Sequence, residues 1–399
     1  MIRLPFLKKK NKLTDKFLTL NFNSEEIRCL AFYFDGSAHR IIGSGTSPLE
    51  EDTVRNGYII NQKNLEEGIK SAVNQATKDL EDRINNVIAG LGGESCFEQT
   101  TTVRYKRPTS SPIELKEIEV LYSKIERASY LQAEGQVLRR TGNPDIEIKN
   151  MTSSDVFTSI DGRLVDNIYE KEGKNIELAV YNAHTPVFQL DALNKSIKHN
   201  KLNLLATCSQ NYALTQWLLQ EYPDNRDFIL IDISKDMTSV SVIFNGGIID
   251  TNSIGLGIKH FIEGLSQKMG LTLKEAKKVL KIYMLDKLSE SEMSVVANCI
   301  EETLNIWLHA VKLLFEEFTG IKTFPSLIYA QGSGIELKDI TKTLEDTKWT
   351  RSIPFKELPE IKTVNLSKLS RIMDSTGKVN NQGWLKSSVL SIIYEEITR

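Results

Sequence analysis

The chain has 399 residues, enough for two or three domains with substantial hydrophobic cores. Apolar residues make up 40% and charged residues 26% of the chain, which is typical of folded globular proteins and excludes an intrinsically disordered chain. The 50 Lys and Arg residues nearly balance the 52 Asp and Glu residues, giving a net charge of −2. A general nucleic-acid binder needs a basic surface, so we expect no nucleic-acid partner.

The cysteines and histidines indicate neither a metal site nor a disulfide framework. The four cysteines never form a Cys-x-x-Cys pair, and the five histidines are scattered along the sequence. No apolar run approaches the roughly 20 residues that a membrane-spanning helix requires, and the N-terminus lacks the apolar core of a signal peptide. We therefore expect a cytoplasmic location.

The N-terminal segment, residues 1–12, combines large apolar side chains with a cluster of lysines. The apolar residues are Ile2, Leu4, Phe6 and Leu7. This composition can rest on an anionic membrane surface, whereas the simpler interpretation is a basic tail without a structural role. If the chain meets the inner face of the cell membrane, we expect this segment to provide the contact.

The first half of the chain has the predicted order strand, strand, strand, helix, strand. Runs of β-branched and aromatic residues at 17–23, 27–34 and 39–45 predict three strands joined by polar turns. Apolar residues at helical spacing between positions 65 and 80 predict a helix, and the apolar run at 87–91 is typical of a buried strand.

A segment with a different pattern follows, and we interpret it as a small α+β module inserted in the first unit. Its first strand, at 101–107, is expected to end at Pro108, and a helix follows from about 118 to 142. The remaining predicted elements are strands at 145–150, 156–160, 163–166 and 176–182, a helix at 191–200 and a strand at 204–208.

The second half repeats the order of the first. The predicted elements are strands at 228–233, 240–245 and 248–253, helices at 259–269 and 273–283, a long helix and a strand at 326–330. The long helix carries an apolar stripe from Val296 to Phe318, and its aromatic residues Trp307 and Phe315 are expected to be core residues. The same β-β-β-α-β unit therefore occurs twice.

These elements predict a tail, two domains and one inserted module. The expected bounds are 1–16 for the tail, 17–100, 201–226 and 381–399 for the first domain, 101–200 for the module, and 227–380 for the second domain, with a helical subdomain at 266–322.

A duplicated β-β-β-α-β unit brings two hairpin turns face to face, and the N–H groups of such turns can cradle phosphates. With this organisation the chain resembles the actin-like ATPase superfamily, and within it the bacterial cell-division protein FtsA and its relative PilM. The likeness rests on the order of the parts, above all the placement of the module, and on residues 17–24, 41–45, 228–239 and 328–340 and the predicted closing helix at 384–397. It implies an α/β fold of duplicated actin-like (ribonuclease-H-like) domains with an inserted α+β module.

The resemblance also implies a site for ATP and Mg²⁺ between the two domains, but the first hairpin departs from the family pattern Asp-x-Gly-[Ser/Thr]. Asn21 and Asn23 stand at the Asp and Gly positions, and only Ser24 matches. An Asn lacks the negative charge that a hard cation prefers, and the Cβ of Asn23 obstructs a close approach of phosphate to the backbone.

The second hairpin should read Asp-x-Gly-Gly-Gly-Thr-Thr-Asp. Asp232 and Thr238 match, whereas Ser234, Lys235 and Asp236 replace the glycines. By resemblance, Asp232 would orient the Mg²⁺ ion, and Ser234, Lys235 and Thr238 would lie near the phosphates. The Asp236 carboxylate would repel them.

Two further segments belong to this implied site. The adenine-side loop keeps Gly332 and Gly334, although glycines between a strand and a helix are also common as turn and packing residues. The helix that would contact adenosine, at 273–280, has Lys277 and Leu280 where the family has an acid and a base.

The resemblance implies an FtsA-like adaptor of bacterial cell division with a degenerate nucleotide site. Its partners would be an FtsZ-like tubulin homologue, other division proteins or further copies of itself. One alternative is a PilM-like platform that holds a short cytoplasmic peptide of a type IV pilus or secretion component, and another is an active actin-like ATPase. The altered motifs predict weak or no ATP hydrolysis, and no catalytic residue is predicted. We expect the module to carry protein contacts, with the Asp161-Gly162 turn and the strand at 176–182 as its exposed edge.

Overall fold

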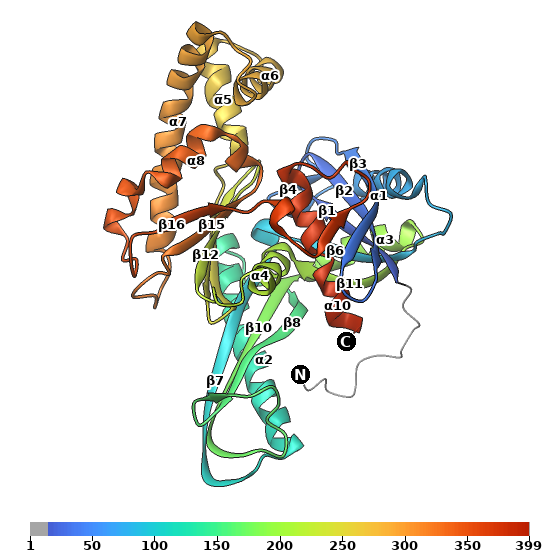
Figure 1. The fold of residues 1–399 in the computed structure, drawn as a ribbon, viewed down its shortest axis with the longest axis vertical. Helices are drawn as coiled ribbons and strands as arrows, with labels where there is room; N and C mark the ends of the chain where they lie inside the picture. The colour runs from blue at the N-terminus through green and yellow to red at the C-terminus, as the bar shows by residue number, and fades with distance from the viewer. Residues whose placement is uncertain (1–14, 399) are drawn as a thin grey trace.

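The computed structural model describes residues 15–398, which form two α/β domains and a smaller module of one sheet and one long helix (Figure 1). Residues 1–14, which carry the predicted membrane contact, lie outside the described part.

The first domain is built on a six-stranded sheet with the strand order β11-β6-β1-β2-β3-β17. β1 pairs antiparallel with β2 and parallel with β6, and all its residues after Lys16 are buried, which explains its nearly continuous apolar sequence. The strands are β1 (Lys16–Phe22), β2 (Glu26–Phe34), β3 (His39–Pro48), β6 (Asn86–Leu91), β11 (Asn203–Ser209) and β17 (Ile372–Asp374).

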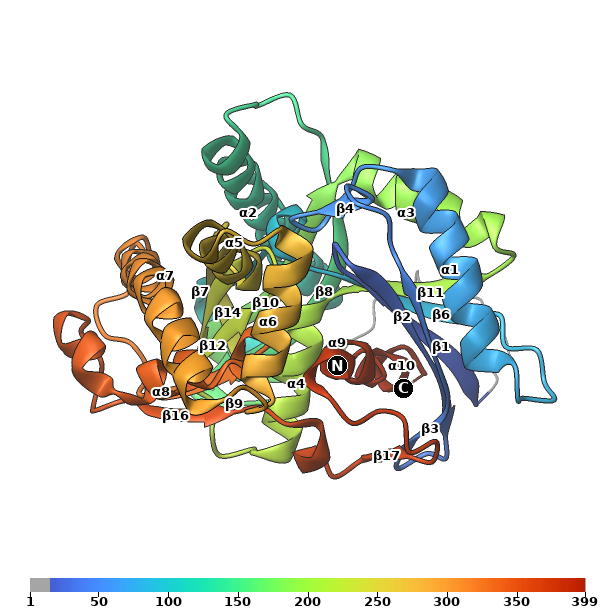
Figure 2. The ribbon, with the colours of Figure 1, turned by 90° about the horizontal axis from the view of Figure 1, so that it is seen from above.

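Helices cover both faces of this sheet (Figure 2). On one face, Leu65 and Ile69 of α1 share a core with Leu193 and Ile197 of α3. On the other face, Trp217 of α4 lies in a core that includes residues of both domains. The helices are α1 (Gln62–Thr77), α3 (Val187–His199), α4 (Gln210–Glu221), α9 (Leu385–Val389) and α10 (Ile392–Thr398), and a small hairpin comprises β4 (Val54–Arg55) and β5 (Tyr58–Ile59).

The second domain repeats the pattern on a five-stranded sheet with the order β14-β13-β12-β15-β16. Its strands are β12 (Phe228–Ile233), β13 (Thr238–Phe244), β14 (Gly247–Ile254), β15 (Leu327–Gln331) and β16 (Glu360–Thr363), and its helices are α5 (Ile258–Met269), α6 (Leu273–Met284), α7 (Glu290–Glu316) and α8 (Lys338–Glu345). Ser289 and Glu292 form a capping box at the start of α7. Trp307 and Phe315 of α7 are 1% and 3% exposed, which confirms them as core residues. β12 pairs with β13 and β15 as β1 pairs with β2 and β6, so the predicted duplication is present.

The module consists of a four-stranded sheet, β7-β10-β8-β9, and the helix α2. The elements are β7 (Phe97–Pro112), α2 (Leu115–Thr141), β8 (Ile148–Ile160), β9 (Arg163–Leu164) and β10 (Glu172–Pro186). Ile118, Leu121 and Ile125 of α2 pack on the sheet, and the module extends away from both domains (Figure 1). Because α3 packs with the first domain, we propose residues 97–186 as the bounds of the module.

A buried carboxylate joins the module to both domains. Glu98 of β7, 2% exposed, accepts hydrogen bonds from Tyr181, Ser209 and Asn211, at 2.9, 2.5 and 2.7 Å, and from Thr251 of β14 at 3.3 Å. These donors come from the module, the first domain and the second domain. The module is therefore anchored where the two domains meet.

The structure corrects four expectations about individual elements. β7 continues past Pro108, because this proline lies on an edge strand at an irregularity in the pairing with β10. β8 is one strand where two were predicted. The strand at 176–182 belongs to β10, which pairs with both β7 and β8, so the prediction that it is an exposed edge is wrong. The closing helix is divided into α9 and α10, where Ser391 donates a hydrogen bond to the Ser388 carbonyl at 2.7 Å.

Candidate functional site

The two hairpin turns predicted to hold phosphates face each other across the interface between the domains. Ser24, in the turn after β1, donates a hydrogen bond to Asp236, in the turn after β12. Glu25, in the first turn, lies 3.4 Å from the ammonium of Lys235 and 2.7 Å from that of Lys277 on α6. The turns are therefore held together by contacts between the protein's own side chains.

The charges around Glu25 determine its protonation. Partial burial raises the pKa of this carboxyl, but the hydrogen bond from Lys277 and the charges of both lysines outweigh the burial and lower the pKa below its usual value. Glu25 is therefore ionised at neutral pH and links the first domain to two cations of the second.

Each turn is also stabilised by its own polar side chain. Asn23 accepts hydrogen bonds from the N–H groups of Glu25 and Glu26 at 2.8 and 3.0 Å, which is an Asx turn. Ser234 donates to the Met237 carbonyl at 2.9 Å. Both turns are therefore stabilised by hydrogen bonds of side chains within the turn itself.

Asn21 stands where the resemblance has a carboxylate. It is 4% exposed and accepts a hydrogen bond from the side-chain amide of Gln210, the first residue of α4. A neutral amide pair occupies this position.

Asp232, the residue implied to orient Mg²⁺, forms an ion pair with Lys386 of α9, with 2.5 Å between Oδ2 and Nζ. Its other oxygen, Oδ1, has no hydrogen-bond partner among the described residues. The positive charge beside this carboxylate is thus supplied by a lysine of the first domain.

Thr238, Gly332 and Gly334 serve the packing of the second domain. Thr238 is fully buried, donates to the Leu256 carbonyl at 2.7 Å and accepts from the Trp307 indole at 2.9 Å, so it is turned away from the cleft. Gly332 has a φ of +98°, and a Cβ there would lie 2.4 Å from the Ile233 carbonyl oxygen. A Cβ at position 334 would lie 2.1 Å from the Ile233 side chain. Both glycines allow the loop after β15 to pack closely on β12.

The cleft that remains between the turns is small. Its volume is about 70 Å³, and its lining includes Asn23, Ser24, Asp232, Ser234 and Lys386. Pockets that bury a small-molecule ligand usually have roughly 300–1,000 Å³. The residues present therefore do not fit a magnesium nucleotide in this arrangement.

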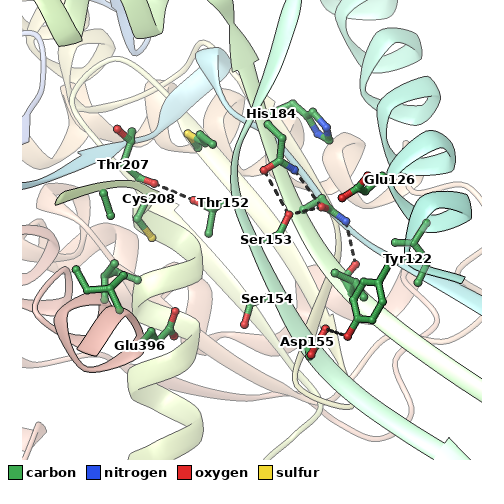
Figure 3. A pocket seen from close by; sticks show the side chains of 18 of the residues that line it. Tyr122, Glu126, Thr152, Ser153, Ser154, Asp155, His184, Thr207, Cys208 and Glu396 are labelled. Carbon is green, nitrogen blue, oxygen red and sulfur yellow. Dashed lines mark hydrogen bonds between the residues drawn. The ribbon is translucent and has the colours of Figure 1, made fainter. Parts of the chain in front are cut away.

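A larger cavity, of about 840 Å³, lies between the module and the first domain (Figure 3). We call it the module groove. Its walls come from α2, β8 and β10 on one side and from β11 and α10 on the other. The lining residues are Tyr122, Ile125, Glu126, Tyr130, Asn150, Met151, Thr152, Ser153, Ser154, Asp155, Val180, Asn182, His184, Leu205, Ala206, Thr207, Cys208, Ile393, Glu396 and Ile397.

The charged residues in this lining are three carboxylates, Glu126, Asp155 and Glu396, and the lining contains no Lys or Arg. Asp155 accepts a hydrogen bond from the Tyr122 hydroxyl at 2.8 Å, and burial raises the pKa of its carboxyl although this hydrogen bond opposes the shift. Burial lowers the pKa of His184 to about 4, so this imidazole is neutral at pH 7. The groove is therefore acidic, with apolar side chains between the acids.

Two strand edges border the module groove. β11 is the last strand of its sheet, and within residues 15–398 β8 pairs on its outer side only with β9, at Ser159 and Ile160. Thr152 donates to the Thr207 carbonyl at 3.0 Å, which links the two edges (Figure 3). Exposed strand edges of this kind can accept an added strand.

The module groove and the residues Lys386, Gln210 and Glu25 of the interdomain cleft were not predicted from the sequence. Lys386 lies in the stretch 384–397 that carries part of the family likeness, but each of the three residues contacts a partner far away in the chain. The carboxylates that line the groove come from α2, β8 and α10, so they form no local pattern in the sequence.

We also searched residues 15–398 for a metal site, a disulfide and a membrane-spanning helix. No cluster of three or more metal-ligating side chains occurs there, and the four cysteines are free. No helix in this part of the chain is long and apolar enough to cross a membrane.

Comparison with known proteins extends these observations. No protein-family model matches the chain. No curated protein matches it either.

Solved structures match nearly the whole chain. A chain of a PilM–PilN type IV pilus biogenesis complex aligns with a TM-score of 0.66 and 14% identity, covering 94% of this chain and 98% of that one. MreB5 of Spiroplasma citri bound to AMPPNP aligns with a TM-score of 0.50 and 12% identity, over 97% and 98%. The ethanolamine utilization protein EutJ of Carboxydothermus hydrogenoformans aligns with a TM-score of 0.50 and 10% identity, over 94% and 88%. The chain therefore has the fold of the actin-like ATPases, which the resemblance and the repeated order of elements in its sequence predicted.

Proposed function

We propose that the protein is a PilM-like platform that binds an extended peptide of a partner protein in the module groove. The partner segment would be basic and apolar, and it would belong to a membrane-associated assembly. The observation that carries this proposal is the acidic groove between the edges of β8 and β11.

The chemistry of the groove supports a peptide ligand. The main chain of a bound segment can pair with the edge of β8, while apolar residues such as Met151, Leu205 and Ile393 contact its side chains. The Glu126 carboxylate at the rim would attract cations and increase the rate of association.

The ion pairs in the interdomain cleft favour a protein that binds a partner over one that hydrolyses ATP. Asp232 is paired with Lys386, and Glu25 is paired with Lys235 and Lys277. These charged side chains are therefore already neutralised within the protein and are not free to bind Mg²⁺ or phosphate. The solved chain that aligns with a TM-score of 0.66 belongs to a PilM–PilN complex, which gives a precedent for a protein partner on this fold.

An FtsA-like adaptor that binds an FtsZ-like tubulin homologue is the second candidate, favoured by the placement of the module between β6 and β11. The resemblance to FtsA and to PilM includes this placement in both cases, so the placement does not separate the two candidates. The two candidates differ in where the partner binds. A PilM-like platform would bind a peptide inside the module groove, whereas an adaptor for a filament would bind its partner on the outer surface of the module.

Crosslinking in the native cell tests the proposal. A photoreactive residue at Ser153, which is exposed in the groove, should capture one membrane-associated protein, identified by mass spectrometry. The matched control carries the photoreactive residue at Ser123, which is exposed on α2 but does not line the groove. A synthetic peptide of the captured segment should then bind the purified chain in calorimetry, and Ala206→Arg should weaken this binding at least tenfold. Capture of an FtsZ-like protein at Ser123 and nothing at Ser153 would favour the division adaptor.

A further inference from the structure

The described chain begins one short helix away from the module groove. Phe17, near the start of β1, stacks on Tyr394 of α10 with 4.1 Å between ring centroids. The same short helix contributes Ile393, Glu396 and Ile397 to the lining of the groove. One helix therefore separates the start of β1 from the groove.

The strand register gives the distance that the preceding residues must span. Leu18 of β1 and Leu204 of β11 both lie opposite Val87 of β6, so they are two strand spacings apart, or about 10 Å. With a rise of about 3.3 Å per residue, Asp15 then lies roughly 15–25 Å from the part of β11 that lines the groove. The residues before Asp15 span up to about 50 Å when extended, so they can reach the groove and follow its length.

The composition of this N-terminal segment is complementary to the groove. Residues 1–12 contain five cations and no carboxylate. The lining contains three carboxylates and no Lys or Arg. The large apolar residues Ile2, Leu4, Phe6 and Leu7 match the apolar lining residues Ile125, Met151, Val180, Leu205, Ile393 and Ile397.

We propose that residues 2–12 of the same chain bind in the module groove and compete there with the partner peptide. This inference rests on the proposed function in treating the groove as a peptide site, and it adds the regulation of that site. A tethered segment has an effective concentration in the millimolar range, so even a weak intrinsic affinity keeps the groove largely occupied. The partner must displace this segment, which would then be released for other contacts.

Disulfide crosslinking of the full chain tests the placement. Phe6→Cys and Ser153→Cys are combined with Cys299→Ser and Cys208→Ser, which remove the one cysteine that is not buried and the cysteine that lines the groove. Mild oxidation should link the two introduced cysteines within one chain, seen as a monomer on a denaturing gel and as one linked peptide pair by mass spectrometry. The control pair Phe6→Cys and Ser123→Cys should stay reduced. A dimeric product places the segment in a second copy, and equal linkage of both pairs indicates random contact; each result would overturn the proposal.

A peptide titration separates this inference from the proposed function. A fluorescent peptide of residues 1–12 should bind the chain that starts at Leu13, and the full chain should bind it about tenfold more weakly because its own segment competes. Glu126→Lys should weaken binding to the shortened chain, whereas Glu119→Lys, exposed on the same helix outside the groove, should leave it unchanged. If the captured partner peptide binds and the 1–12 peptide does not, the inference fails alone; if neither binds, both fail.

The membrane is the competing occupant for this segment. Sedimentation with anionic vesicles compares the full chain with the chain that starts at Leu13. Tail-dependent pelleting without any Phe6–Ser153 linkage would assign the segment to the membrane and overturn the proposal. Linkage in the absence of vesicles, with little pelleting of the full chain, supports it.

Discussion

Lys386 donates a hydrogen bond to Asp232, with 2.5 Å between Nζ and Oδ2, and so ties the closing helices of the first domain to the end of β12 in the second. The two side chains are only 20% and 12% exposed, so solvent screens the pair weakly. A cation built into the chain therefore lies beside the one carboxylate that the family resemblance assigns to Mg²⁺.

We expect Lys386→Met to lower the free energy of unfolding by roughly 1–3 kcal/mol. The variant leaves a mostly buried carboxylate without its cation, which costs more than the loss of a surface pair. Urea denaturation measures the change, and Lys378→Met, at an exposed position in the preceding loop, is the matched control. Adding Asp232→Asn to Lys386→Met should recover part of the loss. An unchanged stability of the single variant would contradict the structural role of the pair.

Glu25→Gln should widen the separation between the two domains. This substitution removes the charge that attracts both Lys235 and Lys277, while the turn itself remains stabilised by Asn23. Spin labels at Lys63→Cys on α1 and Lys278→Cys on α6, both exposed, report the distance by pulsed electron paramagnetic resonance. The distance distribution should become longer and broader, and Glu67→Gln on α1 should not alter it.

The contacts of Glu25 with Lys235 and Lys277 should weaken in acid. Because the pKa of Glu25 is lower in the folded protein than the ordinary 4.5, its contribution to stability is complete above about pH 4.5 and is lost as the pH falls through the folded-state value. The interdomain distance of the unmodified chain should therefore increase below pH 4.5. A constant distance down to pH 3 would rule out the contact as a clamp.

Calorimetry with Mg-ATP should detect no saturable binding tighter than about 1 mM, which corresponds to about −4 kcal/mol. The small cleft volume and the internal pairing of Asp232 and Lys386 are the reasons. The test variant restores the family motifs and removes the lysine, through Asn21→Asp, Asn23→Gly, Ser234→Gly, Lys235→Gly, Asp236→Gly and Lys386→Ala. Binding by this variant would identify the cleft as an altered nucleotide site. Micromolar, magnesium-dependent binding by the unmodified chain would refute the prediction.

Acid should destabilise the protein through two buried histidines. Burial lowers the pKa of His39, against the opposing effect of its hydrogen bond to Glu395, and lowers that of His184 to about 4. Both imidazoles take up protons more readily in the unfolded chain, so their contribution to stability is complete above about pH 6.5 and is lost as the pH falls below it. For His184 the loss reaches about 3 kcal/mol at pH 4.

Unfolding free energies measured from pH 7 to pH 4 check this expectation. His184→Phe should remove a large part of the decline, since a phenyl ring fits the same T-shaped contact with Tyr130 and binds no proton. His199→Gln is the control, because His199 is 67% exposed. Equal pH profiles for the chain and for His184→Phe would show that His184 does not titrate on unfolding.

The duplicated α/β fold could be predicted from the sequence. Strand runs such as residues 228–233 and the stripe from Val296 to Phe318 are apolar because the elements they form are buried, and burial leaves a periodic pattern that can be recognised locally. The repetition of one strand order then predicted the duplicated domains. Two exceptions were local: Pro108 lies at a pairing irregularity, and Ser391 lies between α9 and α10, where hydrophobic spacing alone predicts one helix. The position of β10 between β7 and β8 was not local, because strand pairing joins distant segments.

The contents of the candidate sites could not be predicted, because they depend on contacts between distant segments. Lys386 is 154 positions from Asp232, and Lys277 is 252 positions from Glu25, so no spacing in the sequence connects either pair. The module groove likewise combines β8, β11 and α10, whose edges and faces become neighbours only when the module packs on the first domain. Local periodicity records which side chains are buried, whereas the partner of a charge or the wall of a groove depends on how separate elements pack together.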